Sequence, residues 1–234
     1  MANNLTKSDF EPLLQNPLYA AMPPEAREQV EARGRLRRFS LGQLVFSKGD
    51  PADGAFALIS GALEYSTTSR SGKQSVLNIL QPGKWLGDLS LLDGKGRTMD
   101  CWALKESAVM YLSGRDFLEL LDAVPAFMRM MLLLQVERIR QLLEWSEALT
   151  KLGAEGRLAE RLLLFARSHG REDPAGIRLD IKLTQELIAE LIGTTRQRVN
   201  QIMNHWEDEG ILLLDGRTIV LQDLAALKGF VDLA

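Results

Sequence analysis

Four polar residues in the C-terminal part of the chain have the side-chain types that read DNA bases. The spacing i, i+1, i+4 and i+5 places them on one face of a helix: Arg196, Gln197, Asn200 and Gln201. An arginine can bind guanine through two hydrogen bonds, and a glutamine or asparagine can do the same for adenine. A polar helix face is most often simply solvated, so the neighbouring residues have to distinguish the two interpretations.

The neighbouring residues have the pattern of a helix-turn-helix motif over 183–210. Thr184 and Thr195 can each cap a helix, and Gly193 lies at the turn, where a positive φ is often required. Gly210 marks the end of the second helix. The expected inner faces are Leu187, Ile188 and Leu191 on the first helix, and Val199, Ile202, Met203 and Trp206 on the second.

The order of charges along the second helix favours DNA binding. Arg196 and Arg198 lie in its first turn and the acidic run 207–209 in its last, so both placements oppose the helix macrodipole. A helix whose N-terminal end meets phosphates and base edges needs this arrangement. We therefore predict a DNA-contacting surface that also includes Thr184, Thr195 and Arg198.

A β-hairpin is expected over 211–221. Asp215-Gly216 between two apolar β-type runs is a strong hairpin signal, and a hairpin after a helix-turn-helix gives the winged form. Arg217 at the tip can contact a phosphate, or it can be an ordinary solvated turn residue. The sequence leaves both interpretations open.

A second group of residues, over 87–98, has the chemistry of an anion site. Gly87 allows close backbone approach, and one helical turn over 88–92, which includes Leu89, offers free N–H groups. Arg97 can bind a phosphate with its fork of donors, and Thr98 adds a hydroxyl donor. Asp88 can accept a hydrogen bond from a sugar hydroxyl. The alternative is a plain loop with an exposed arginine.

The elements that carry these two sites change character along the chain. Residues 5–33 are expected to be helical, with a helix start at Pro23-Pro24. Short β-type runs separated by Gly, Pro and Asp turns fill 36–112, which indicates a β-barrel or sandwich. We expect a long helix at 126–152, a hinge at 153–156, a helix at 157–169 and a loop at 170–174.

The long helix has an apolar stripe with heptad spacing. Its members are Leu132, Ile139, Leu142 and Leu149, with Val136 and Leu143 beside them. The stripe can pack on the helix's own domain, or it can form a parallel coiled coil between two subunits. We favour the dimer, because a helix this long cannot bury its whole stripe on a small barrel. The expected organisation is a sensor domain at 1–124, a dimerisation helix at 125–152 and a DNA-binding domain at 153–234.

The composition is that of a two-domain, cytoplasmic protein. The chain has 234 residues, a net charge of −3 and a pI of about 5.6, so positive charge has to be concentrated where DNA would bind. Cys101 is the only cysteine, which rules out an internal disulfide, a zinc site or an iron–sulfur cluster built on cysteines. No nucleophile–base pair, metal cluster or P-loop is visible, so we do not expect an enzyme. No signal peptide is visible, and the apolar stretch at 126–136 is too short to span a bilayer.

Taken together, these residues resemble the Crp/Fnr regulators, the family of the cyclic AMP receptor protein. The likeness covers almost the whole chain, including 42–50, 59–61, 82–83, Gly87-Asp88-Leu89 with Arg97-Thr98, and Gly156-Arg157. It implies an α+β fold with an N-terminal cyclic-nucleotide-binding-type β-roll, a long dimerisation helix and a C-terminal winged helix-turn-helix. It also implies a homodimer that regulates transcription at a two-fold symmetric double-stranded DNA operator, often with RNA polymerase contact.

The resemblance leaves the effector open. Cyclic-AMP-binding members have a glutamate at the position of Asp88, and Arg97-Thr98 matches their phosphate-binding pair. Their adenine-reading pair aligns with Leu142 and Leu143, which offer no hydrogen bonds. The effector is therefore cyclic AMP held differently, cyclic GMP, cyclic di-GMP, or none. The family's oxygen-sensing cysteine cluster and its haem ligands have no counterparts here. Cys101 is expected to be a buried neutral thiol, with a redox switch as the alternative.

The resemblance also predicts an operator that differs in sequence from that of the cyclic AMP receptor. Arg196 matches the family's guanine-reading arginine and Thr184 a phosphate-contacting position. Gln197 and Gln201 stand where the cyclic AMP receptor has Glu and Arg, so the half-site should differ. A competing hypothesis is a nucleotide-sensing module that acts through protein contacts, with the winged helix as a docking surface.

Overall fold

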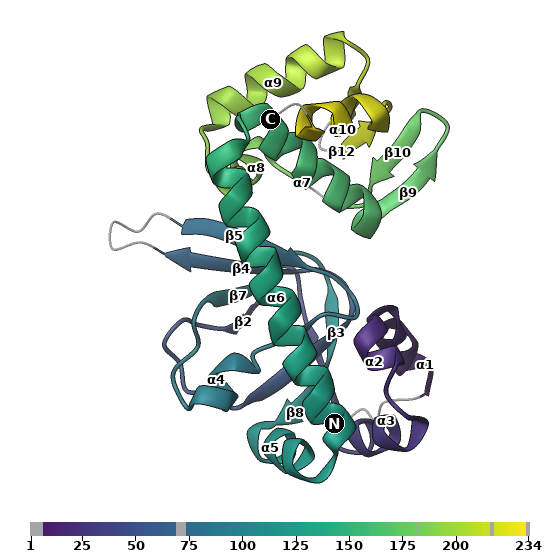
Figure 1. Ribbon diagram of the computed structural model, residues 1–234, viewed down its shortest axis with the longest axis vertical. Helices are drawn as coiled ribbons and strands as arrows, with labels where there is room; N and C mark the ends of the chain where they lie inside the picture. The colour runs from purple at the N-terminus through teal and green to yellow at the C-terminus, as the bar shows by residue number, and fades with distance from the viewer. Residues whose placement is uncertain (1–6, 69–73, 182, 216–217, 233–234) are drawn as a thin grey trace. The chain divides into compact units, whose positions relative to one another are not determined.

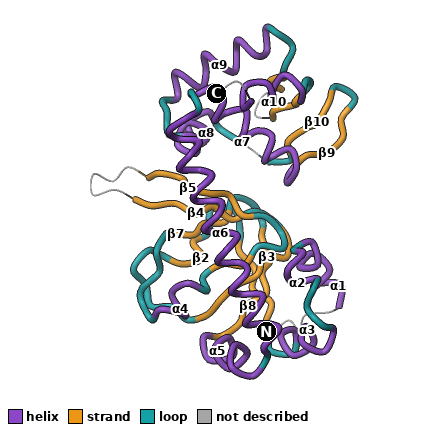
Figure 2. The backbone as a smooth tube through the Cα atoms, viewed as in Figure 1, coloured by secondary structure: helices purple, strands orange, loops and turns teal. Residues whose placement is uncertain are grey.

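The computed structural model describes residues 7–68, 74–181, 183–215 and 218–232. The chain divides into two compact units, Met1–Ile139 and Arg140–Ala234, and the division falls within a long helix. The first unit carries the anion site expected at 87–98, and the second carries the expected helix-turn-helix. Figure 1 labels most of the helices and strands, and Figure 2 separates helix from strand by colour.

The described part of the first unit begins with four short helices, where the sequence predicts helix over 5–33. They are α1 (Lys7–Phe10), the 3-10 helix η1 (Glu11–Gln15), α2 (Pro17–Ala20) and α3 (Pro24–Glu31). Most of the described residues in this range are helical, whereas 16, 21–23 and 32–33 are not, and the expected start at Pro24 is correct. Prolines account for the interruptions, because a proline fits the first turn of a helix and breaks a helix interior. Residues 5 and 6 lie outside the described part of the chain.

Two four-stranded antiparallel sheets form a small barrel, as the β-type runs over 36–112 predict. One sheet has the order β1-β8-β3-β6 and the other β2-β7-β4-β5. Their register pairs Phe56 with Tyr111 and Tyr65 with Cys101. The strands are β1 (Arg35–Phe39), β2 (Leu44–Phe46), β3 (Gly54–Ser60), β4 (Leu63–Thr68), β5 (Gln74–Leu80), β6 (Trp85–Leu86), β7 (Asp100–Ala103) and β8 (Ser107–Ser113).

Three helices complete the described part of the first unit: α4 (Leu89–Asp93), α5 (Gly114–Ala123) and α6 (Pro125–Lys151), whose first part belongs to this unit. The prediction of a helical turn at 88–92 and of a long helix at 126–152 is confirmed within one residue. Phe127 packs edge-on against Trp85 at 5.7 Å between ring centroids, and Met130, Met131 and Leu134 join the same buried cluster. This burial fixes the N-terminal half of α6 against the barrel.

In the described part of the second unit, the C-terminal end of α6 is followed by four helices and the four strands of one sheet. They are α7 (Ala154–His169), β9 (Gly170–Asp173), β10 (Gly176–Leu179), α8 (Gln185–Ile192), α9 (Arg196–Asp208), β11 (Leu212–Asp215), β12 (Thr218–Leu221) and α10 (Leu224–Asp232). The sheet has the order β11-β12-β10-β9. The wing hairpin predicted over 211–221 is thus the edge of a four-stranded sheet.

Two sequence predictions in this unit are wrong. The hinge is not 153–156, because α7 begins at Ala154 and only Leu152 and Gly153 are non-helical. Gly156 serves packing, since a Cβ there would lie 2.9 Å from the Phe230 carbonyl oxygen. The stretch 170–174 is not a loop either. It is largely β9, and the strand forms because β10 is held by β12, with Ile177 opposite Leu221.

Candidate nucleic-acid interface and effector site

The helix-turn-helix is formed by α8 and α9, with the caps and turn that the sequence predicts. The Thr184 hydroxyl accepts a hydrogen bond from the Leu187 N–H at 3.1 Å, and the Thr195 hydroxyl accepts one from the Arg198 N–H at 3.2 Å. Gly193 has φ +65°, the left-handed conformation that a side chain would strain. These local interactions fix where each helix begins and how the chain turns between them.

The two faces of α9 differ in burial as predicted. Its apolar stripe is at most 2% exposed: Val199, Ile202, Met203 and Trp206. On the outer face Arg196, Gln197 and Gln201 are exposed, and Asn200 is half-buried. The four predicted base readers therefore have the positions expected of them, while their contact with bases stays a prediction.

Arg198 pairs with Glu155 of α7, at 2.9 Å between Nη2 and Oε1. Both side chains are about half exposed, at 48% and 40%. An exposed ion pair of this kind contributes about 0–1 kcal/mol, so Arg198 can exchange it for a phosphate contact at little cost.

Sequence reasoning missed two amide side chains beside Asn200. Asn200 Nδ2 donates to Gln185 Oε1 at 3.1 Å, and Asn204 Nδ2 donates to Asn200 Oδ1 at 3.2 Å. Asn204 follows Asn200 by one helical turn, so its spacing was a usable signal. Gln185 lies on α8, and only the crossing of the two helices brings it to this face.

The wing is present, with Leu214 opposite Ile219 and Asp215 opposite Thr218. Its tip, which includes Gly216 and Arg217, lies outside the described residues. The predicted phosphate contact of Arg217 therefore stays a prediction. Arg178 of the neighbouring strand β10 forms two ion pairs. Its Nε lies 2.6 Å from Asp173 Oδ2, and its Nη1 lies 3.0 Å from Oδ2 of Asp215 on the wing strand β11.

Arg97 is buried in the barrel rather than exposed on a loop, which excludes the plain-loop alternative. The residue is 3% exposed, and its guanidinium lies 4.4 Å from the centroid of the Phe46 ring. Nη1 donates to the Gly87 carbonyl at 2.6 Å. Nη2 donates to the Gly54 carbonyl at 2.8 Å and to Asp53 Oδ1 at 2.9 Å.

One nitrogen of Arg97 has no hydrogen-bond partner in this arrangement among the residues that the structure describes. This nitrogen is Nε, which is buried. A buried donor without a partner costs about 1–3 kcal/mol, so the site favours an acceptor there. Gly87 is the close-approach position that the sequence predicts. It has φ +77°, and a Cβ would lie 2.6 Å from Arg97 Nη1.

Asp88 is predicted to accept a hydrogen bond from a sugar hydroxyl, but its carboxylate accepts hydrogen bonds from side chains of α6 instead. It is 1% exposed, and its Oδ2 accepts from Gln135 Nε2 and from Arg138 Nη1, both at 2.7 Å. Arg138 Nη2 donates to Oδ1 at 3.1 Å and to the Trp85 carbonyl at 2.6 Å. Burial lowers the pKa of Arg138, but the charge and hydrogen bonds of Asp88 outweigh it and raise that pKa. Sequence reasoning missed Arg138 and Gln135.

The remaining residues of the predicted effector site lie at the surface. Thr98 is exposed, Leu89 is 45% exposed, and Leu142, which belongs to the second unit, is 67% exposed. Cys101 is fully buried, and burial raises the pKa of its thiol, in agreement with the buried neutral thiol expected. Among the described residues, no His, Cys, Asp or Glu cluster is arranged to hold a metal ion.

The apolar stripe of α6 predicted from the heptads is uncovered in the single chain. Its residues are Leu132, Val136, Ile139, Leu142, Leu143 and Leu149, with exposures from 45% to 67%. We call this set the α6 stripe. In the described part of the chain, no helix is both long enough and apolar enough to cross a bilayer.

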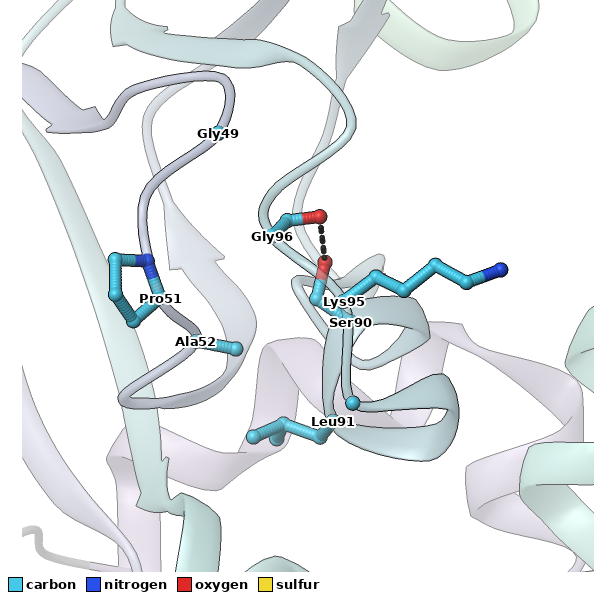
Figure 3. Close-up of a pocket in the computed structure, with 8 residues that line it drawn as sticks. Gly49, Pro51, Ala52, Ser90, Leu91, Lys95 and Gly96 are labelled. Carbon is cyan, nitrogen blue, oxygen red and sulfur yellow. Dashed lines mark hydrogen bonds between the residues drawn. The ribbon is translucent and has the colours of Figure 1, made fainter.

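A shallow cavity of about 410 Å³ lies between the 49–52 loop and the 90–96 segment (Figure 3). Ser90 Oγ donates to the Gly96 carbonyl at 3.1 Å beside it. Lys95 is the one charged side chain among the described residues that line it, and it points away at 81% exposure and pairs with Asp93. We therefore assign the candidate effector site to Arg97 and not to this cavity.

Two family models match the chain. The model described as "Cyclic nucleotide-binding domain" matches residues 36–124, and the one described as "Crp-like helix-turn-helix domain" matches residues 156–230. Together they cover the barrel and the helix-turn-helix described above.

Curated relatives match over most of their length. The CRP-like cAMP-activated global transcriptional regulator of Mycobacterium tuberculosis is 25% identical, over 88% of this chain and 92% of its own. The global nitrogen regulator of Synechococcus elongatus is 29% identical, over 83% of this chain and 88% of its own. These relatives are named as regulators.

Solved structures agree in fold. The c-di-GMP responsive global regulator CLP of Xanthomonas campestris superposes with a TM-score of 0.74 at 19% identity, over 86% of this chain and 100% of its own. A double mutant of CooA from Carboxydothermus hydrogenoformans superposes with a TM-score of 0.69 at 28% identity, over 86% of this chain and 88% of its own. The chain therefore shares its fold with these two proteins.

Proposed function

The chain belongs to the Crp/Fnr family of transcription regulators, with a cyclic-nucleotide-binding domain and a Crp-like DNA-binding domain, and from that premise we propose how it works. It acts as a homodimer that binds a two-fold symmetric operator and responds to a phosphate-containing effector at Arg97. The observation that carries this proposal is the exposed polar face of α9, opposite a fully buried apolar stripe.

Arg196 reads a guanine in the major groove in this proposal. Gln197 and Gln201 read the neighbouring bases, while Thr184, Thr195 and Arg198 contact phosphates. The charge order along α9 supports this orientation, because the arginines lie at its N-terminal end and the acidic run 207–209 at its other end. The operator lies in the cytoplasm of a bacterial cell, and RNA polymerase is the expected further partner.

The α6 stripe supports the homodimer. Six apolar side chains at heptad-like spacing, each about half exposed or more, need a partner, and a second copy of the same helix is complementary to them. Two recognition helices can then lie about 34 Å apart, one turn of DNA, and read both half-sites. The effector shifts the population between spacings that fit the operator and spacings that do not.

The residues at Arg97 fit a phosphate, and those at Asp88 do not offer a free ribose contact. Arg97 Nε is a buried donor in need of an acceptor, and Gly87 leaves room for the guanidinium. Both oxygens of Asp88 already accept bonds from α6. The family and its cAMP-activated relatives point to a cyclic nucleotide, and we propose cyclic AMP, cyclic GMP or cyclic di-GMP as the class to test.

The DNA-binding part of the proposal is tested by selecting an operator from random duplexes and measuring single variants on it. Arg196→Ala should cost about 1–3 kcal/mol and relax the preference at one base pair. Arg198→Ala should weaken binding to all sequences alike and lower the salt dependence, as expected of a phosphate contact. Arg171→Ala, which removes an exposed arginine paired with Asp180, is the control and should change neither property.

The result that contradicts the proposal is selection of no consensus from purified protein with each of the three nucleotides present. Unchanged promoter output in Arg196→Ala and Gln201→Ala would instead support the competing hypothesis of a docking module.

A further inference from the structure

Asp53 supplies a negative charge to Arg97 from within the chain. This residue lies in the loop directly before β3, and its Oδ1 is 2.9 Å from Arg97 Nη2. Its side chain is 54% exposed, whereas that of Arg97 is 1% exposed. The cation is therefore fixed and buried, and the anion paired with it stands at the edge of solvent.

The unsatisfied donor of Arg97, Nε, shares a fork with Nη2, which donates to Asp53. A guanidinium binds a phosphate or carboxylate with two parallel bonds, and one such fork consists of Nε and Nη2. Nη2 is taken by Asp53 and by the Gly54 carbonyl, while Nε has no partner among the described residues. An anion that takes both donors has to replace one acceptor of Nη2. The Gly54 carbonyl is backbone, so Asp53 is the replaceable one.

The surroundings of Asp53 allow its side chain to move while its backbone stays. The Asp53 carbonyl accepts hydrogen bonds from the Tyr111 hydroxyl and from the Gly114 N–H, both at 2.8 Å. Its other carboxylate oxygen, Oδ2, already pairs with Arg37 Nη1 at 3.1 Å. Arg37 is itself held 3.3 Å above the centroid of the Tyr111 ring. A carboxylate released by Arg97 therefore keeps a cationic partner.

We propose that Asp53 is a built-in competitor of the effector: it occupies Arg97 in the free protein, the effector's phosphate displaces it, and it thereby sets the effector affinity. The proposal rests on the effector site proposed above and adds a residue that the sequence did not single out.

The test is calorimetric titration of the full-length protein at pH 7 with four probes: cyclic AMP, cyclic GMP, cyclic di-GMP and inorganic phosphate. Asp53→Asn keeps the shape of the side chain and removes its charge. Hydrogen bonds to charged groups change an equilibrium constant by about tenfold to a hundredfold. Because the asparagine still accepts a weaker bond from Arg97, we expect a gain near the lower end, about tenfold in Kd, for each probe that binds.

The matched control is Asp93→Asn, which removes the same charge from the same unit. Asp93 pairs with the exposed Lys95 and not with Arg97, so its replacement should leave Kd unchanged. Adding Arg97→Gln to Asp53→Asn should abolish the gain. Where that double variant fails to fold, the difference between Asp53→Asn and Asp93→Asn decides alone.

Three outcomes overturn the proposal. Equal or weaker binding by Asp53→Asn means that Asp53 orients Arg97 for the effector. An equal gain in Asp93→Asn means that only net charge matters. Absence of binding of all four probes to both wild type and Asp53→Asn means that Arg97 is not an anion site. The operator selection is independent of all three, so DNA binding stands or falls separately.

Discussion

The pairing of Asp88 with Arg138 should be a major stabilising interaction of the first unit, and Arg138→Ala measures it. Asp88 is 1% exposed and accepts two bonds from Arg138 and one from Gln135. Removing one partner of a fully buried pair costs about 3–5 kcal/mol, because a charge is left buried. The Arg138 side chain is 35% exposed and Gln135 remains, so we take about 2–3 kcal/mol.

The assay is urea unfolding of the full-length protein, with thermal unfolding beside it. A loss of about 2–3 kcal/mol should lower Tm by roughly 4–12 °C for a chain of this size. Arg129→Ala, which removes an exposed arginine from the same helix, should stay within about 0.5 kcal/mol. The double variant Asp88→Asn with Arg138→Ala should be less destabilised than the two single losses added together.

The reasoning is refuted if Arg138→Ala falls within about 1 kcal/mol of wild type, or if the double-mutant cycle gives a coupling near zero. The Asp88–Arg138 pair would then be no more stable than the hydrogen bonds that both groups make to water. The packing of α6 on the barrel would rest on Phe127, Met130 and their neighbours alone.

Three further results are expected. Ile139→Asp places a charge at a 57% exposed position of the α6 stripe, so it should leave the fold intact and convert dimer to monomer in analytical sedimentation. Leu164→Asp, at an exposed leucine of α7, should leave the dimer unchanged. A dimeric Ile139→Asp variant contradicts the assignment of the α6 stripe to the dimer interface. Burial raises the pKa of Asp53, but Arg37 and Arg97 outweigh this effect and lower that pKa below its ordinary value. The stabilisation by the Asp53 carboxylate is therefore complete above about pH 4 and is lost as pH falls through the folded-state pKa. In urea unfolding, the difference in stability between wild type and Asp53→Asn should shrink below about pH 4, and a difference that does not depend on pH contradicts this prediction. Gly87→Ala should destabilise by more than about 1 kcal/mol in the same assay, since φ is +77° and the new Cβ meets Arg97 Nη1; a neutral effect disproves the close approach.

The helix-turn-helix was predictable because its determinants are local. Thr184, Gly193 and Thr195 act on residues at most five positions away, so a reader of the sequence sees both members of each interaction. The faces of α9 follow from helical periodicity in the same way. Strand β9 was missed for the opposite reason, because the β10 strand that holds it pairs with Leu221, far along the chain.

The effector site shows the same limit more sharply. Arg97 was singled out from its neighbours, but its anionic partner Asp53 lies 44 residues earlier in the chain. Asp88 was assigned to a sugar hydroxyl because it follows Gly87, whereas the residue that binds it, Arg138, lies 50 residues later. Residue type indicated which groups need partners, and only the folded chain shows which partners they have.

The α6 stripe also bears on how promoter occupancy depends on protein abundance. The six side chains of the α6 stripe are 45–67% exposed in a single chain, so covering them by a second copy gains free energy. If the proposed homodimer forms, the amount of dimer rises with the square of the chain concentration while dimers are scarce. Occupancy of a promoter then responds more steeply to synthesis and degradation of the chain than it would for a monomer.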